Sequence, residues 1–279
     1  MPISVLLIVL AGALLHASWN LLIKAGHDTR VVTASVYTGA GALAALALPF
    51  LPHLPPAAWP YLAASTGLEV LYGVLLASAY RLGDLSLAYP LMRGSAPLLV
   101  ALGSGALVGE PLSAGIWAGV MLVCVGIFLM LFDARPQGHG LAAAGVALVN
   151  AVLIAAYTTI DGLGVRASRQ PLSYGAWIFI LTGLPWLLWV GLRYRVHFHA
   201  RARRLLPAAL IGGACSLGSY AAALWAMTRA PVAAVAAVRE SSILFAIVLG
   251  VLVLHERLTR ARALAAGFIL LGVWCIRAG

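Results

Sequence analysis

The stretch that decides the fold is Arg93–Ser113, RGSAPLLVALGSGALVGEPLS, an apolar run with one arginine at its start and one glutamate near its end. The same pattern returns 146 residues later, at Arg239–Thr259, as RESSILFAIVLGVLVLHERLT. In both stretches 16 residues separate the arginine from the glutamate, and a leucine and a hydroxyl residue close the pattern. Similarity at a fixed offset indicates an internal repeat. We therefore predict that the chain consists of two related halves.

The composition around these stretches predicts a membrane protein. Hydrophobic residues make up 63% of the 279 and charged residues only 9%, whereas a soluble domain carries about 25% charged residues. This excludes soluble enzymes, nucleic-acid-binding proteins and secreted disulfide scaffolds. A membrane-crossing helix needs about 20 apolar residues. Ten runs of that kind lie at about 2–23, 31–51, 59–80, 85–108, 112–132, 138–162, 172–192, 205–228, 231–253 and 259–277.

The ten runs divide equally between the two halves. We expect a first five-helix repeat at residues 1–133, a linker at 134–137 and a second repeat at 138–279. Because five is an odd number, the second repeat enters the membrane inverted relative to the first. Inverted repeats of this kind place the substrate path near the midplane between them. The predicted fold is an all-α membrane protein of ten transmembrane helices, arranged as two inverted five-helix repeats around a central cavity.

The basic residues predict the orientation of these spans. The formal net charge is +10. The loops after odd-numbered spans hold twelve of the eighteen lysines and arginines, several of them in a predicted loop of about a dozen residues at 193–204, RYRVHFHARARR. The remaining loops and the C-terminus hold four. Since basic residues collect in cytoplasmic loops, we expect both termini to lie outside.

Four acidic or basic side chains fall near the bilayer centre in predicted spans: Glu69, Arg93, Arg239 and Glu240. Each costs about 2.5–3.5 kcal/mol near the bilayer centre on insertion scales, so each needs a reason to be there. Two positive and two negative groups suggest the pairs Glu69–Arg93 and Arg239–Glu240. Such pairs either hold the bundle together or line a polar cavity for a charged substrate or a proton, and we favour the cavity.

Other polar residues share faces with these spans. His16, Trp19 and Asn20 lie on one helical face of the first span, and Tyr157 and Asp161 are one turn apart in the sixth. The remaining candidates are the aromatic residues Tyr72, Tyr89, Tyr220 and Trp225.

The sequence offers no metal or cofactor site. Cys124, Cys215 and Cys275 are too far apart for metal-ligand spacing and read as small core residues. His197 and His199 lie in the basic stretch, where we expect them to be solvated. Glu110 and Glu256 fall at helix ends, where we expect a structural role in capping the following connection.

These features resemble the drug/metabolite transporter superfamily, EamA type. The resemblance lies in the ten spans, the two five-span repeats, the EPLS and ERLT motifs that begin at Glu110 and Glu256, and the HASWN face at 16–20. It implies a secondary carrier in which spans 1, 3, 4, 6, 8 and 9 surround a central cavity and spans 5 and 10 lie peripherally. Most bacterial members resemble exporters, which implies a multi-pass protein of a bacterial-type inner membrane. The family's substrates are diverse.

From the side chains we favour a small zwitterion, an amino acid or an amino-acid-derived compound of the opine or metallophore kind. Arg93 and Arg239 would grip carboxylates through forked hydrogen bonds, and Glu69 or Glu240 would meet an ammonium group. Glu69 is the preferred proton carrier and Glu240 the second. The expected partners are this substrate, protons and the lipid bilayer, with no cofactor and no nucleic acid; the protein is a monomer or a homodimer. A lipid-linked sugar flippase and a membrane-embedded enzyme stay open as alternatives.

Overall fold

The computed structural model describes the chain except for residues 26–28, 83–84, 134–139 and 194–197. Within the described residues it contains helices and connections and no strand. The α-helices are α1 (Ile3–Ala25), α2 (Thr29–Ala47), α3 (Trp59–Leu82), α4 (Leu85–Gly103), α5 (Ala114–Leu129), α6 (Gly140–Ser168), α7 (Pro171–Arg193), α8 (Phe198–Met227), α9 (Val232–Arg239), α10 (Ser242–Leu254) and α11 (Arg260–Ala278). Short η elements are η1 (Leu48–Phe50), η2 (Pro56–Ala58), η3 (Ser104–Val108) and η4 (Met130–Asp133).

Every predicted span corresponds to a helix, with two differences. Residues 198–204, expected in a loop, form the first turns of α8. The ninth span, a single run of apolar residues in the sequence, is two helices, α9 and α10, separated at Glu240 and Ser241. The predicted linker at 134–137 lies outside the described residues.

Nine segments in the described part of the chain are long and apolar enough to cross a membrane. One of them, Val232–Leu254, comprises α9 and α10 together, and α3 is not among the nine. Large apolar side chains are exposed on the outside of the bundle, for example Leu141 at 91% and Trp274 at 61%. An exterior of this kind suits lipid rather than water, so the chain is a multi-pass membrane protein.

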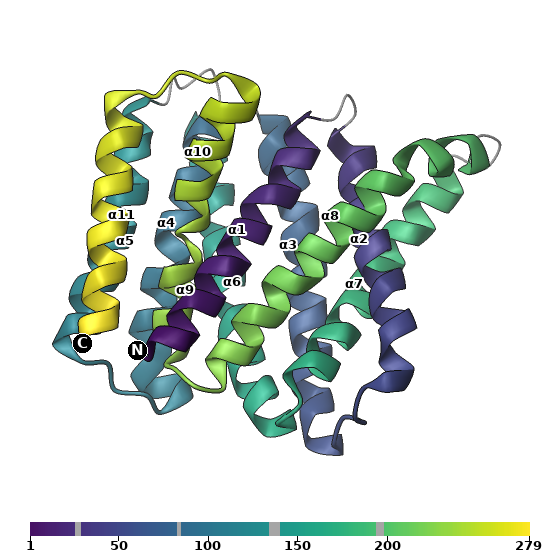
Figure 1. Ribbon diagram of the computed structural model, residues 1–279, viewed down its shortest axis with the longest axis horizontal. Coiled ribbons are helices and arrows are strands. Elements are labelled where there is room, and N and C mark those ends of the chain that lie inside the picture. The colour runs from purple at the N-terminus through teal and green to yellow at the C-terminus, as the bar shows by residue number, and fades with distance from the viewer. Residues whose placement is uncertain (26–28, 83–84, 134–139, 194–197) are drawn as a thin grey trace.

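The helices form a broad bundle with α5 and α11 packed together at one edge (Figure 1). Small residues make that close packing possible: a Cβ at Gly119 would lie 2.6 Å from the Gly272 carbonyl oxygen. At the other side of the bundle α2 packs between α7 and α8. The centre is occupied by α9, in which every residue from Val232 to Val238 is buried.

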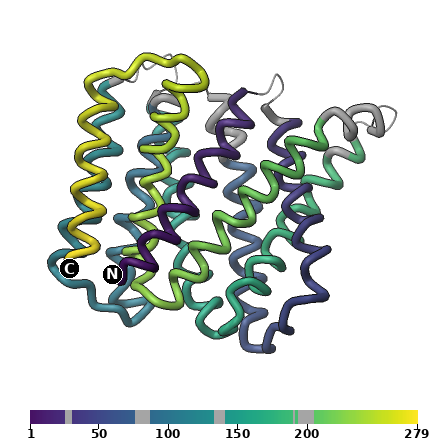
Figure 2. Tube along the Cα trace, in the orientation of Figure 1, coloured from purple at the N-terminus to yellow at the C-terminus, as the bar shows by residue number. Residues whose placement is uncertain are grey.

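Both chain ends lie at the same end of the bundle (Figure 2). The amino group of Met1 donates a hydrogen bond of 3.1 Å to the carbonyl oxygen of Arg277. The connection from α10 to α11 lies at the opposite end (Figure 2). Because both termini lie at the same end, the chain crosses the bundle an even number of times.

Candidate functional site

The break between α9 and α10 places charged groups in the middle of the bundle. Around the break the backbone hydrogen bonds join residues three apart instead of the four of an α-helix. The Glu240 amide donates to the Ala237 carbonyl at 3.1 Å and the Ser241 amide to the Val238 carbonyl at 3.0 Å. The Ser241 hydroxyl also donates to the Val238 carbonyl, at 2.7 Å. Such local bonds compete with the helical pattern. No proline interrupts the span, and the break falls at the polar run Glu240-Ser241-Ser242.

Glu240 forms an ion pair with Arg93 of α4. The Arg93 Nε lies 2.9 Å from the Glu240 Oε2, and the two side chains are only 10% and 7% exposed. The sequence predicted the pairs Glu69–Arg93 and Arg239–Glu240. Both predictions are wrong, because Arg93 and Glu240 pair with each other. Adjacent residues of a helix do not face each other, so Arg239 and Glu240 diverge. Glu69 is on α3, which packs along α6 and scarcely touches α4.

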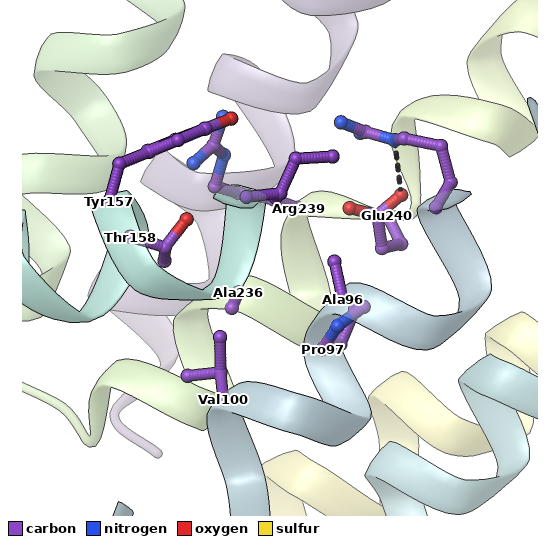
Figure 3. A pocket seen from close by; sticks show the side chains of 10 residues that line it. Ala96, Pro97, Val100, Tyr157, Thr158, Ala236, Arg239 and Glu240 are labelled. Carbon is purple, nitrogen blue, oxygen red and sulfur yellow. Dashed lines mark ion pairs between the residues drawn. The ribbon is translucent and has the colours of Figure 1, made fainter. Parts of the chain in front are cut away.

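A small cavity lies beside this ion pair, between α4, α6 and α9 (Figure 3). Its polar lining comes from Arg93, Tyr157, Thr158, Arg239 and Glu240. Alanine, proline, valine and isoleucine side chains of the same helices complete the wall. The cavity measures about 20 Å³, which is room for about one water molecule. The site in this structure therefore has no room for a solute as large as an amino acid.

A second group of buried polar side chains surrounds Asp161 of α6, and together with the ion pair it forms the polar region of the bundle. Asp161 is fully buried and accepts a 3.1 Å hydrogen bond from the Tyr174 hydroxyl. The Tyr220 hydroxyl donates to its other carboxylate oxygen. The Tyr220 ring also lies under Arg239, with the guanidinium carbon 5.2 Å from the ring centroid. Tyr220 therefore connects the carboxylate of α6 with the guanidinium of α9.

Arg239 differs from Arg93 in its partners. In the part of the chain that the structure describes, no carboxylate lies within ion-pairing distance of Arg239. Its charge still acts on the nearby carboxylates of Asp161, Glu69 and Glu240. Arg239 is the cation of this region that is held by a ring face rather than by an ion pair.

The remaining predicted residues surround this region to different degrees. Glu69 lies close enough to Asp161 and Arg239 to interact with both charges. Tyr72 packs edge-on against Tyr157 with their ring centroids 6.0 Å apart. Tyr89 interacts electrostatically with Arg93, and His16 with both arginines.

Of the predicted residues, the cavity is lined by Arg93, Tyr157, Arg239 and Glu240. Three of the others make the following contacts. The Asn20 amide donates back to the His16 carbonyl at 2.7 Å, within its own helix. The ring of Trp19 packs against His16 on one side and Tyr37 on the other. Trp225 stacks on Arg229, whose guanidinium carbon is 4.0 Å from the ring centroid, near the end of α8.

Two residues of the polar region, Thr158 and Tyr174, were not predicted from the sequence. Thr158 is three residues before Asp161 and shares its helical face, so its place in the polar region follows from the helical spacing. Tyr174 lies in the first turn of α7, in a run of apolar and aromatic residues where nothing distinguished it from core. Its role becomes visible only once α7 packs against α6.

Comparisons with known proteins match part of the chain to a transporter family and the whole chain to the fold of a solved structure. Residues 141–278 match the model of the EamA-like transporter family. No curated protein matches the chain. One solved structure, described only as the crystal structure of a protein, is 21% identical with a TM-score of 0.77, over 99% of this chain and 96% of that one. At that identity the likeness shows a shared fold across the whole chain and nothing of its activity.

Proposed function

From the premise that residues 141–278 form a domain of the EamA-like transporter family, we propose that this protein is a secondary active exporter of a small zwitterionic metabolite. The favoured substrate is an amino acid or an amino-acid-derived compound of the opine or metallophore kind. The observation that carries this proposal is the grouping of two guanidinium and three carboxylate groups around one buried region. Charges at such depth are costly and typically mark a substrate or ion path.

Arg239 is the proposed anchor for the substrate carboxylate. Its guanidinium carries no ion pair among the described side chains, whereas Arg93 is held by Glu240. A guanidinium offers a planar fork that matches a carboxylate. Arg93 becomes a second anchor only when Glu240 releases it, which would couple substrate binding to movement of α4 against α9.

Asp161 and Glu69 form the proposed site for the substrate ammonium. A carboxylate offers about four acceptor positions, and two tyrosine hydroxyls occupy only part of that capacity at Asp161. Glu69 lies nearby and has no ion pair among the described residues. It is also the favoured proton carrier, ahead of Glu240, because Arg93 already neutralises Glu240.

The small volume of the cavity supports a carrier that works by alternating access. A space for one water cannot hold an amino acid, so binding requires the surrounding helices to separate. In a carrier with inverted repeats, the two repeats rock around a central site. We place the repeats at 1–133 and 138–279, giving ten membrane helices with α3 included, and both termini outside a bacterial-type inner membrane. The carrier is a monomer or a homodimer.

Equivalent connections in the two halves support the repeat. The Glu110 amide donates to the Ser104 carbonyl at 3.0 Å, and 146 residues later the Glu256 amide donates to Gly250 at 3.0 Å. The residue before each glutamate has a positive φ, 72° at Gly109 and 55° at His255. The N-caps that follow, Ser113 of α5 and Thr259 of α11, each accept one amide hydrogen bond of 3.2 Å.

A ligand screen tests the proposal. Purified protein is heated with individual amino acids and amino-acid derivatives, and compounds that bind raise the unfolding temperature by mass action. We expect a zwitterion to stabilise the wild type and to lose this effect in Arg239→Ala. Arg229→Ala is the matched control, because Arg229 also stacks on a ring but lies at a helix end.

Transport of the stabilising compound is then measured in proteoliposomes. Equal stabilisation of wild type and Arg239→Ala would contradict the carboxylate anchor. Stabilisation only by compounds without a carboxylate would contradict the substrate class.

A further inference from the structure

Two ion pairs join the halves of the chain at opposite ends of the bundle. At one end Lys24, in the last turn of α1, pairs with Glu256, just before α11. Arg262 binds the same carboxylate, with its Nη1 2.9 Å from the Glu256 Oε2. Lys24 belongs to the first half, and Glu256 and Arg262 to the second. The Lys24–Glu256 contact thus crosses between halves, and the Arg262–Glu256 contact does not.

The other end repeats this arrangement with the halves exchanged. Arg166, in the last turn of α6, pairs with Glu110 at 2.6 Å between Nη2 and Oε1. The second oxygen of Glu110 accepts the Val232 amide at 2.9 Å, at the beginning of α9. Arg166 also donates to the carbonyls of Met227 at 2.8 Å and Ala230 at 3.2 Å. It therefore joins the end of α6, the α8–α9 connection and the glutamate of the other half.

The correspondence between the two ends follows the 146-residue repeat. Glu110 and Glu256 occupy equivalent positions, and α1 and α6 are the first helices of their halves. Each glutamate binds the basic residue at the C-terminal end of the first helix of the other half. A basic side chain is favourable at that end of any helix. Its pairing with a glutamate of the other half, in contrast, arises only when the two halves pack together.

The two ion pairs are separated by the thickness of the bundle. Met1 contacts Arg277, and the Ser113 hydroxyl donates to the Gly279 carbonyl, so Glu110 lies at the end that carries the termini. Helix α1 has 23 residues and is about 34 Å long at 1.5 Å per residue. Lys24 therefore lies at the far end from Met1, where the α10–α11 connection also lies (Figure 1).

We propose that these pairs are the two latches of the carrier, an inference that builds on the proposed transport function. The Lys24–Glu256 latch closes one entrance to the central site, and the Arg166–Glu110 latch closes the other. With both formed, the helices lie close together around the cavity, which accounts for its small volume of about 20 Å³. Opening toward one side breaks the latch at that end and leaves the other intact. The conformation open at one end and the conformation open at the other end then differ as the two latches do, with the roles of the two halves exchanged.

The latches differ in exposure. The side chains of Lys24 and Glu256 are 61% and 26% exposed, and those of Arg166 and Glu110 are 30% and 19% exposed. Exposed ion pairs contribute less because water screens them. Arg166–Glu110 is further supported by the Val232 amide. The Lys24 end is therefore the easier end to open.

The test measures access to the cavity from each side and needs no substrate. Cys124, Cys215 and Cys275 are replaced by alanine, and a single reporter, Ala236→Cys, is introduced in the cavity wall. An impermeant thiol reagent is applied to right-side-out and to inside-out vesicles. Lys24→Gln and, separately, Glu256→Gln are expected to raise labelling about two- to fivefold from the Lys24 end only.

The remaining variants give the opposite side and the control. Glu110→Gln is expected to raise labelling from the end that carries the termini. Arg262→Gln removes the ion pair of Glu256 that stays within one half, and it should leave labelling unchanged from both sides. A rise from both sides, a rise from the wrong side, no rise with Lys24→Gln and Glu256→Gln, or a rise with Arg262→Gln would each overturn the latches. The ligand screen with Arg239→Ala tests the transport proposal independently of these outcomes.

Discussion

Removing the carboxylate of Glu240 tests the central ion pair most directly. Glu240→Gln keeps the size of the side chain and leaves the Arg93 guanidinium, 10% exposed in the wild type, without its counter-charge. Loss of one partner of a buried pair costs about 3–5 kcal/mol, because the other charge stays buried and uncompensated. With a shift of about 2–4 °C per kcal/mol, the scale for large domains, the unfolding temperature should fall by about 6–20 °C.

The assay is thermal unfolding in detergent, followed by the fluorescence of the eight tryptophans in the sequence. The double variant Arg93→Met/Glu240→Gln removes both charges, and we expect it to recover most of the lost stability but to be inactive in transport. Glu256→Gln is the matched control: its ion pairs are exposed, so the expected loss is about 1 kcal/mol or less. A Glu240→Gln variant as stable as Glu256→Gln, or a double variant no more stable than Glu240→Gln, would refute the buried pair.

Three further outcomes are expected. Arg239→Ala should abolish transport in proteoliposomes and Arg239→Lys should not restore it, because an ammonium lacks the planar fork; full activity with lysine would show that only charge is needed. Glu69→Gln should lose accumulation driven by a pH gradient while exchange of substrate survives, and wild-type uptake indifferent to the gradient would refute proton coupling. Hydrogen bonds from Lys24 and then Arg262 hold the pKa of Glu256 below its ordinary value of 4.5. The latch therefore stabilises the folded state above that pH and is lost as the pH falls through the lowered pKa. The difference in unfolding temperature between wild type and Glu256→Gln should be constant from pH 8 to about 5 and shrink in stronger acid, and a difference that grows in acid would contradict this.

The sequence by itself determined that the chain is a bundle of membrane helices with a polar centre. Hydropathy over about 20 residues is a local property, and the cost of burying Arg93 or Asp161 in a lipid environment does not depend on the identity of the partner. The repeat between Arg93–Ser113 and Arg239–Thr259 could also be found in the sequence, because both stretches carry an arginine, a glutamate, a leucine and a hydroxyl residue at the same spacing.

Only the tertiary structure decided which charges meet. Arg239 and Glu240 are neighbours in the chain but diverge on the helix, and Glu240 reaches Arg93 because α9 packs against α4. The break between α9 and α10 and the contact of Tyr174 with Asp161 also depend on packing between helices. The same holds for Glu110 and Arg166, 56 residues apart. Ion pairs between helices depend on how the helices cross, and the positions of the residues along the chain do not give these crossings.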